Sequence, residues 1–153
     1  MMMLIFQGDG ITPFTILLDR FSENISNAAP IFDEIANVFA SSQAQNFGSG
    51  GGFYGYWAPL TPAYAAWKSA RYPGAPILTR TGELRSSMAE RPFGIEHIDD
   101  KRMVVGTALH YAKYHQGGTE NMTARKIVHP PTPSELRQYG NILHRFAFQG
   151  VAA

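Results

Sequence analysis

The sequence predicts an α+β fold, in which a long kinked N-terminal helix packs on a small, mainly antiparallel sheet, with a short middle helix and a C-terminal helix. Three observations support this class: an apolar stripe at helical spacing near the N-terminus, short apolar segments separated by turn residues in the middle, and a second helical pattern near the C-terminus. The elements do not alternate as regular βαβ units, so a parallel α/β sheet is not expected.

Length and composition are those of one ordinary domain, which we expect to span residues 1–153. The chain has 153 residues, of which 44% are hydrophobic, enough to bury a single core. It contains no cysteine, which excludes disulfides and cysteine metal sites and is compatible with a reducing cytoplasm. The apolar run at residues 1–6 is too short to span a bilayer, and no basic residue precedes it. Neither secretion nor membrane insertion is therefore indicated.

The N-terminal helix is the clearest element in the sequence. Apolar residues recur at helical spacing from Phe14 to Phe39, as on one face of a helix. Pro30 removes a helical hydrogen bond and clashes with the preceding turn, so the helix should kink there or divide in two. A straight helix over residues 13–46 would be roughly 50 Å long at about 1.5 Å per residue, and a compact domain of this size is only roughly 40 Å across. The apolar face is expected in the core, unless a protruding half offers it to a partner.

A glycine-rich segment at residues 47–56 follows this helix and is predicted to be a flexible loop. It lacks a Gly-Lys-Ser/Thr ending and a preceding strand, so a phosphate-binding loop is not expected. Its aromatic residues are candidates for contact with a partner, and a plain flexible connection is the alternative. The candidates are Phe53, Tyr54, Tyr56 and the following Trp57.

Two further helices have recognisable starts. Thr61-Pro62 is typical of an N-cap followed by proline in the first turn, and the helix should stop near residues 72–74. Near the C-terminus, Thr132 and Glu135 have the spacing of a capping box, which precedes the apolar residues of a final helix.

The sheet is predicted from short apolar segments between turns. Residues 84–88 alternate as in a strand, although a short helix is an open alternative. Residues 95–98 and 103–105 are the next candidates, with turns at residues 92–94 and 99–101 joining consecutive strands. Further extended segments are expected at residues 4–6 and 125–129.

Charge is divided unevenly along the chain. Residues 1–60 carry one base and five acids, giving −4, whereas residues 61–153 carry 12 bases and seven acids, giving +5. The near-neutral total argues against a dedicated nucleic-acid binder. The division could bring the acidic surface of one copy against the basic surface of another, and solvated faces are the alternative.

No complete catalytic, cofactor-binding or metal-binding constellation is present, so an enzyme is not expected. The five histidines lack the spacing of a ligand cluster, and Ser86 and Ser87 lie outside any Gly-x-Ser-x-Gly motif. Several acids could be imagined as a magnesium-dependent nuclease centre, but they are more simply solvent-facing turn residues. They are Glu83, Glu96, Asp99 and Asp100.

Three blocks in order along the chain carry a family resemblance: residues 57–60 (Trp-Ala-Pro-Leu), residues 77–86 (Ile-Leu-Thr-Arg-Thr-Gly-Glu-Leu-Arg-Ser) and residues 111–119 (Tyr-Ala-Lys-Tyr-His-Gln-Gly-Gly-Thr). Together they resemble the tail-completion, or virion morphogenesis, family of tailed bacteriophages. The resemblance implies a structural protein of the tail or neck region of the virion, assembled in the cytoplasm of the bacterial host. It would finish the tail and join it to the head as a ring, with six copies expected. Tail terminator, neck component and head-closure protein remain alternatives.

The resemblance implies partners rather than a substrate: other copies of the chain, the tail tube and the neck or connector proteins, with DNA passing nearby in the channel and no membrane. Arg80 and Arg85 could touch that DNA or pair with the acidic half of another copy. The segment at residues 111–118 surrounds a histidine with hydrogen-bonding side chains, which suits a turn or a subunit contact. The candidate interface residues there are Tyr111, Tyr114, His115 and Gln116. Two other functional classes remain open, a small phage-encoded DNA-binding or metal-dependent DNA-processing protein and an oligomeric scaffold outside virions.

Overall fold

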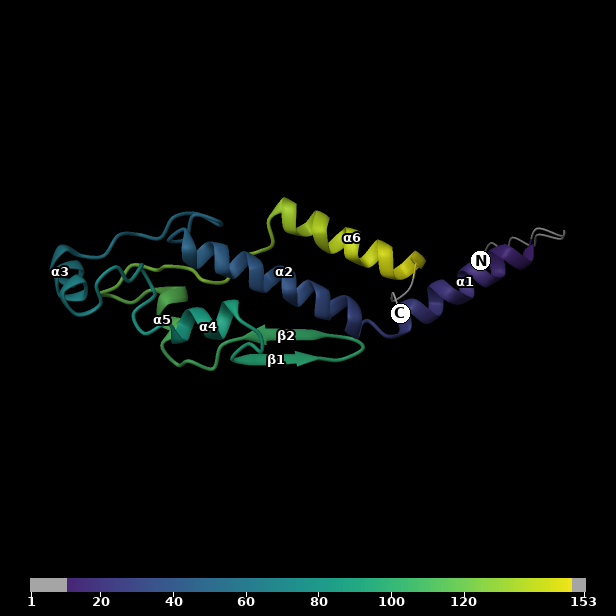
Figure 1. Cartoon of the computed structure of the whole chain (residues 1–153), viewed down its shortest axis with the longest axis horizontal. Helices are drawn as coiled ribbons and strands as arrows, with labels where there is room; N and C mark the ends of the chain where they lie inside the picture. The colour runs from purple at the N-terminus through teal and green to yellow at the C-terminus, as the bar shows by residue number, and fades with distance from the viewer. Residues whose placement is uncertain (1–10, 150–153) are drawn as a thin grey trace.

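The computed structural model describes residues 11–149, with side chains from Asp19 onward. This part of the chain forms six α-helices and one two-stranded antiparallel sheet in an elongated body (Figure 1). The expected α+β class is confirmed. None of the helices described is long and apolar enough to cross a membrane.

The N-terminal helix divides in two, as Pro30 predicts. Helix α1 spans Ile11–Ser26 and α2 spans Ala29–Gly48, with Pro30 in the first turn of α2, where its missing N–H costs no helical bond. At the break, the Ala28 N–H donates to the carbonyl of Asp100 at 3.1 Å, which fixes the junction to the tip of the hairpin. Helix α1 therefore leaves the body at an angle and extends beyond the end of the C-terminal helix (Figure 1).

Helix α2 is the centre of the fold. The C-terminal helix α6, Pro133–Gln149, packs on one side of it, and α4, Glu83–Ala89, packs on the other together with the hairpin (Figure 1). The core gathers at the C-terminal end of α2, where the Phe47 ring lies edge-on to Trp57 with centroids 5.3 Å apart. The cluster is completed by Leu84, Met88 and Ile127. Each such side chain contributes roughly 1.5–3 kcal/mol on burial.

The strand predicted at residues 84–88 is wrong, and the alternative of a short helix is right. Leu84 and Met88, which alternate in sequence, are also four residues apart, so one helix face buries both against the core. Residues 92–94 consequently join α4 to the first strand instead of joining two strands. Tertiary burial decided between two patterns that the sequence left open.

The hairpin is where the sequence places it. Strand β1, Ile95–Ile98, pairs antiparallel with β2, Met103–Gly106, and Ile95 lies opposite Gly106. In the turn, the Asp99 carboxylate accepts the N–H groups of Lys101 and Arg102 at 2.9 Å each. These bonds lower the pKa of Asp99 to about 2. Residues 125–129 run without joining this sheet, and residues 4–6 lie outside the described part of the chain.

The remaining helices begin as expected. Helix α3, Pro62–Arg71, has Thr61 as its N-cap, with the hydroxyl accepting the Tyr64 N–H at 3.4 Å. At the start of α6, the Thr132 hydroxyl accepts the Glu135 N–H at 3.2 Å, and the Glu135 carboxylate accepts the Thr132 N–H at 2.7 Å. Both bonds of the predicted capping box are therefore present. Helix α5, Ala112–Gly117, occupies the segment where the sequence suggested a turn.

The glycine-rich segment after α2 forms a series of hydrogen-bonded turns. The Gly51 N–H donates to Asn46 at 2.8 Å, and the Trp57 N–H donates to Gly50 at 3.0 Å. Gly51 has φ +93°, and a Cβ there would lie 2.7 Å from the Trp57 ring. This turn needs glycine, because an L side chain is strained at that φ and has no room. The flexibility of the loop, like the single domain, stays a prediction.

Candidate functional site

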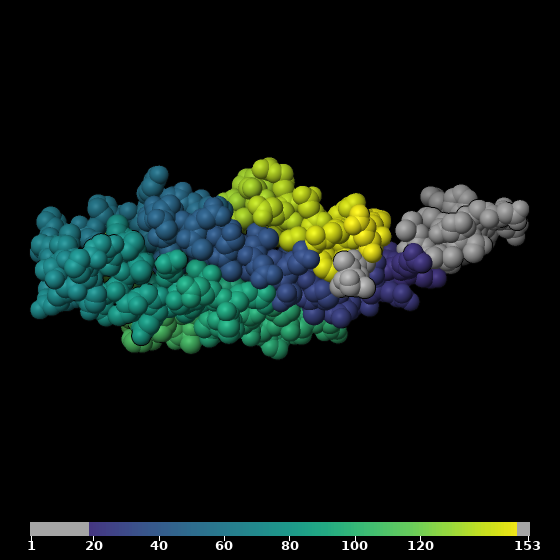
Figure 2. Space-filling model, viewed as in Figure 1, coloured from purple at the N-terminus to yellow at the C-terminus, as the bar shows by residue number. Residues whose placement is uncertain are grey.

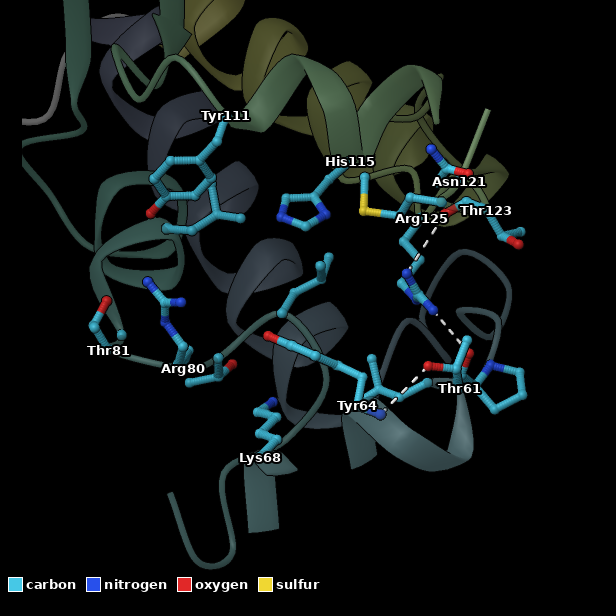
Figure 3. A pocket seen from close by; sticks show the side chains of 17 residues that line it. Thr61, Tyr64, Lys68, Arg80, Thr81, Tyr111, His115, Asn121, Thr123 and Arg125 are labelled. Atoms are coloured by element: carbon cyan, nitrogen blue, oxygen red, sulfur yellow. Dashed lines mark hydrogen bonds between the residues drawn. The ribbon is translucent and has the colours of Figure 1, made fainter. Parts of the chain in front are cut away.

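A cavity of about 630 Å³ opens near the α3 end of the molecule (Figure 3). Its walls come from α3, the segment before α4, the start of α5 and the segment that follows α5. The core cluster lies next to it, since Leu84 contributes to both. The lining includes four basic side chains and no carboxylate: the bases are Lys68, Arg80, His115 and Arg125.

Lys68 brings a buried ammonium group to this cavity. It lies on the inner face of α3 with 4% of its surface exposed, and its Nζ donates to the carbonyl of Pro76. Burial lowers the pKa of Lys68, because removing the ammonium from water disfavours its charged form. Within residues 19–149, no carboxylate forms an ion pair with it. Among these residues, the bond that satisfies the ammonium is the one to a neutral carbonyl.

Arg125 is the second buried cation, with 7% of its surface exposed. Its guanidinium donates to the carbonyls of Ala58 and Pro59, at 2.7 Å each. These bonds attach the stretch before α3 to the segment that follows α5. No acid of the described side chains pairs with Arg125 either, so its positive charge reaches the cavity without neutralisation.

Three further features of the wall are unusual. Nδ1 of His115 and the hydroxyl of Thr79 are buried, and neither has a hydrogen-bond partner among the described residues. Burial, with the nearby Arg125 charge, lowers the pKa of His115, which favours its neutral form. Leu78 has φ +59°, a left-handed conformation that costs on the order of 1–3 kcal/mol in a residue other than glycine. Such strain and unused polar atoms are concentrated at binding sites.

Exposed aromatic rings of α3 lie beside the cavity: Tyr64 lines it, and Trp67, outside the lining, stacks on Tyr64, and we call this pair the rim. Tyr64 and Trp67 stack on α3 with centroids 5.4 Å apart, and they remain 42% and 37% exposed. The Arg71 guanidinium lies 4.9 Å from the Trp67 ring, a cation–π contact. Tyrosine, tryptophan and arginine are the residues most enriched at the energetic centres of protein interfaces. The arrangement can bind an anion in the cavity and an apolar surface on the rim.

The structure brings three of the predicted interface residues into this site: Arg80, Tyr111 and His115 all line the cavity. Arg85 and Tyr114 are exposed outside its lining. Gln116 instead binds the segment that follows α5: its amide oxygen accepts the Ile127 and Val128 N–H groups, and its amide nitrogen donates to the Val128 carbonyl at 2.8 Å.

The aromatic residues after α2 are separated from one another. Phe53 lines a second cavity, of about 390 Å³, between α2 and α6. Tyr54 stacks on His129, and Tyr56 is 84% exposed. Trp57 is buried, and its indole N–H donates to the Lys126 carbonyl at 2.7 Å. The proposed contact of these residues with a partner stays a prediction.

Sequence reasoning missed Lys68, Arg125, Tyr64 and Trp67 as site residues. Tyr64 and Lys68 are four residues apart, so their common helix face was visible in the sequence. Nothing in the sequence showed that Arg125, far along the chain, would complete the same cavity.

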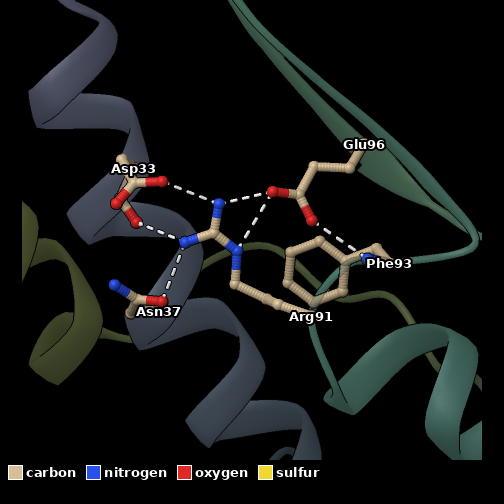
Figure 4. A network of polar contacts seen from close by, with 5 residues as sticks. All are labelled: Asp33, Asn37, Arg91, Phe93 and Glu96. Carbon is tan, nitrogen blue, oxygen red and sulfur yellow. Dashed lines mark hydrogen bonds and ion pairs between the residues drawn. The ribbon is translucent and has the colours of Figure 1, made fainter.

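Several acids of the N-terminal half are occupied within the chain. Arg91 bridges α2 and β1, donating to Asp33 at 2.7 Å, to Asn37 at 2.9 Å and to Glu96 (Figure 4). The hydrogen bond from Arg91 lowers the pKa of Glu96 below its usual range. Glu34 pairs with Arg145 on α6. Two of the five N-terminal acids, Asp33 and Glu34, are thus paired within the chain.

The carboxylates considered for a metal centre are dispersed. Glu83 begins α4, Glu96 binds Arg91, and Asp99 caps the hairpin turn. Over the described range, no group of three histidine or acidic residues could hold a metal ion.

Comparison with known proteins supplies the biological setting. Residues 9–139 match the phage virion morphogenesis family, and the chain belongs to this family. The chain is also similar to the Mu-like prophage FluMu G protein 2 of Haemophilus influenzae, with 28% identity over 119 residues, which are 78% of this chain and 73% of that protein. No solved structure matches the chain.

Proposed function

We propose that this member of the phage virion morphogenesis family is a tail-completion protein, which ends the tail and joins it to the head or neck as a ring of copies. Six copies are expected, located in the tail or neck region of the virion. The tail tube and the neck or connector proteins are the proposed partners. The protein acts by fitting against these surfaces, with no catalytic step.

One structural observation supports a ring: the two ends of the elongated molecule differ. The α3 end has exposed aromatic rings beside a basic cavity. Helix α1 lies at the other end of the elongated body (Figure 1), whose surface is drawn in Figure 2. Closed rings with more than two copies are built from heterologous contacts, in which one face meets a different face of the next copy. A molecule with unlike ends is suited to that symmetry.

Particles made without this protein provide the test. Electron microscopy should show filled heads separate from unjoined tails, or tails of abnormal length, and expression of the wild-type chain in trans should restore joined particles. Unjoined tails of normal length would favour a neck role, and overlong tails would favour termination. Normal infectious particles in its absence would refute the assignment.

The ring is tested separately by native mass spectrometry of the purified chain, alone and with its tail partners. A closed oligomer is expected at least in their presence. A chain that stays monomeric beside those partners would contradict ring formation.

A further inference from the structure

The basic cavity contains charges that no described acid of the same chain neutralises. Burying a cation without an anionic partner costs several kcal/mol after relaxation. Both Lys68 and Arg125 are more than nine-tenths buried and are bonded only to neutral carbonyls among the described residues. Two other buried or half-buried charges of the described residues differ from them, since Arg91 binds two carboxylates and Glu135 binds a hydroxyl and a backbone N–H. An incoming carboxylate would relieve the cost in the cavity.

Helix α1 carries acids that the described part of the fold does not use. Its inner face packs on α6, with Phe21 5.5 Å from Phe148 and the Asn24 amide donating to the Ala147 carbonyl at 3.2 Å. Asp19 and Glu23 are four residues apart and lie on the opposite, exposed face. Neither forms an ion pair with the side chains described, in contrast to Asp33 and Glu34 on α2.

The acids and the cavity lie at opposite ends of the molecule (Figure 1). An α1 helix therefore cannot reach the cavity of its own chain, but it can reach that of a second copy. We propose that the cavity lined by Lys68, Arg80 and Arg125 receives the Asp19 and Glu23 carboxylates of α1 from a neighbouring copy. The inference rests on the proposed ring and specifies its contact: a head-to-tail interface in which α1 inserts its acidic face between the aromatic rim and the basic wall. Opposite charges provide its specificity, and the exposed rings provide its apolar area.

Disulfide trapping tests the contact directly, because the natural chain has no cysteine. The variants Glu23→Cys and Arg80→Cys are prepared separately and mixed under mild oxidation with the tail partners present. A mixed disulfide dimer is expected, and the double variant should form a ladder up to the closed ring. The matched control pairs Glu23→Cys with Arg137→Cys, an exposed position on α6, and should give no specific product. Equal yields from the two pairs would overturn the proposal.

A second variant tests the role of the buried Lys68 ammonium group. Lys68→Met keeps the aliphatic stem and removes the charge. It should raise the melting temperature of the dilute, dispersed chain by about 4 °C, since replacing a poorly compensated buried charge by an apolar side chain is stabilising. The same variant should weaken self-association by about tenfold or more. Lys101→Met, at an exposed turn position, is the control for both measurements.

The outcomes separate this contact from the proposed function. A wild-type ring that forms without the Glu23–Arg80 cross-link would overturn the contact and leave tail completion standing. A lower melting temperature for Lys68→Met with unchanged association would mean that Lys68 only holds the Pro76 carbonyl, which also overturns it. Tight, salt-sensitive binding of duplex DNA that is lost in Lys68→Met, without the cross-link, would assign the cavity to phosphate instead. A wild-type chain that remains monomeric would contradict both the proposed contact and the proposed function as a ring.

Discussion

The carboxylate of Glu135 connects α6 to the glycine-rich segment, and its removal should destabilise the fold. Its side chain is 1% exposed. One oxygen accepts the Thr132 N–H, and the other accepts the Tyr54 hydroxyl, each at 2.7 Å. Glu135→Ala breaks both charge-assisted bonds and leaves two donors without partners.

Hydrogen bonds to a charged group contribute roughly 1.5–3 kcal/mol each. Relief of the buried carboxylate offsets part of this loss, so Glu135→Ala should cost about 3 kcal/mol, or about 6–12 °C in melting temperature for a chain of this size. Tyr54→Phe removes one bond and should cost about 1.5 kcal/mol. In the double variant the phenol is already absent, so the total loss of stability should stay at about 3 kcal/mol and not reach the sum of the two single losses.

Thermal and urea unfolding followed by circular dichroism measure these differences. Glu120→Ala, an exposed acid with no hydrogen bond to its side chain in the described fold, is the matched control. Additive losses for Glu135→Ala and Tyr54→Phe, or a loss below about 1 kcal/mol for Glu135→Ala, would refute the reasoning.

The pH dependence provides an independent check on the same carboxylate. Burial alone would raise the pKa of Glu135, but the hydrogen bonds it accepts from Thr132 and Tyr54 outweigh burial and lower it. Since the folded pKa is depressed, its contribution is present above the unfolded pKa of about 4.3 and is lost as the pH falls through the folded pKa. The stability difference between wild type and Glu135→Ala should therefore shrink below about pH 4. A difference that stays constant with pH would contradict this assignment of the carboxylate.

Two other substitutions follow from the packing. Arg91→Met should lower the free energy of unfolding, measured with a chemical denaturant, by about 2 kcal/mol, because it leaves a half-buried carboxylate unpaired between α2 and β1. The control Arg85→Met, at an exposed position, should be neutral. Equal effects of the two substitutions would show that the Arg91 bridge does not stabilise the fold. Gly51→Ala should cost about 2 kcal/mol or more, because a Cβ meets Trp57 at 2.7 Å and φ is +93°. Gly48→Ala, with no atom within 4 Å of its Cβ, should be neutral or slightly stabilising, and the opposite order would contradict the turn geometry.

Local signals predicted much of the fold. The capping box at Thr132 and the N-cap at Thr61 are readable because their bonds join residues three apart. The division near Pro30 follows from the missing donor of one residue. By contrast, residues 84–88 fit a strand and a helix equally, and only burial of Leu84 and Met88 on one side decides.

The candidate site was harder to predict from the sequence, because segments far apart along the chain come together to form it. Arg80, Tyr111 and His115 were selected from the sequence, but their common cavity depends on Lys68 from α3 and on Arg125 from beyond α5. Lys68 shares a helix face with Tyr64 in the sequence, but nothing local shows that it is buried, and Arg125 has the sequence context of a solvated surface base. Their burial follows from distant segments, so no window of sequence contains the signal.

The division of charge shows how composition and structure complement each other. A −4 half and a +5 half suggested that copies attract one another, but Asp33 and Glu34 pair with Arg91 and Arg145 of their own chain. Among the charges without an ion pair in the described residues are the exposed acids on α1 and the bases in the cavity, at opposite ends of the molecule. A charge that is already paired within the chain attracts a neighbouring copy less strongly than an unpaired one. We therefore expect the intersubunit contact between charges that are not paired within the chain. The expected interface joins the acidic face of α1 to the basic cavity, rather than the acidic half of the sequence to the basic half.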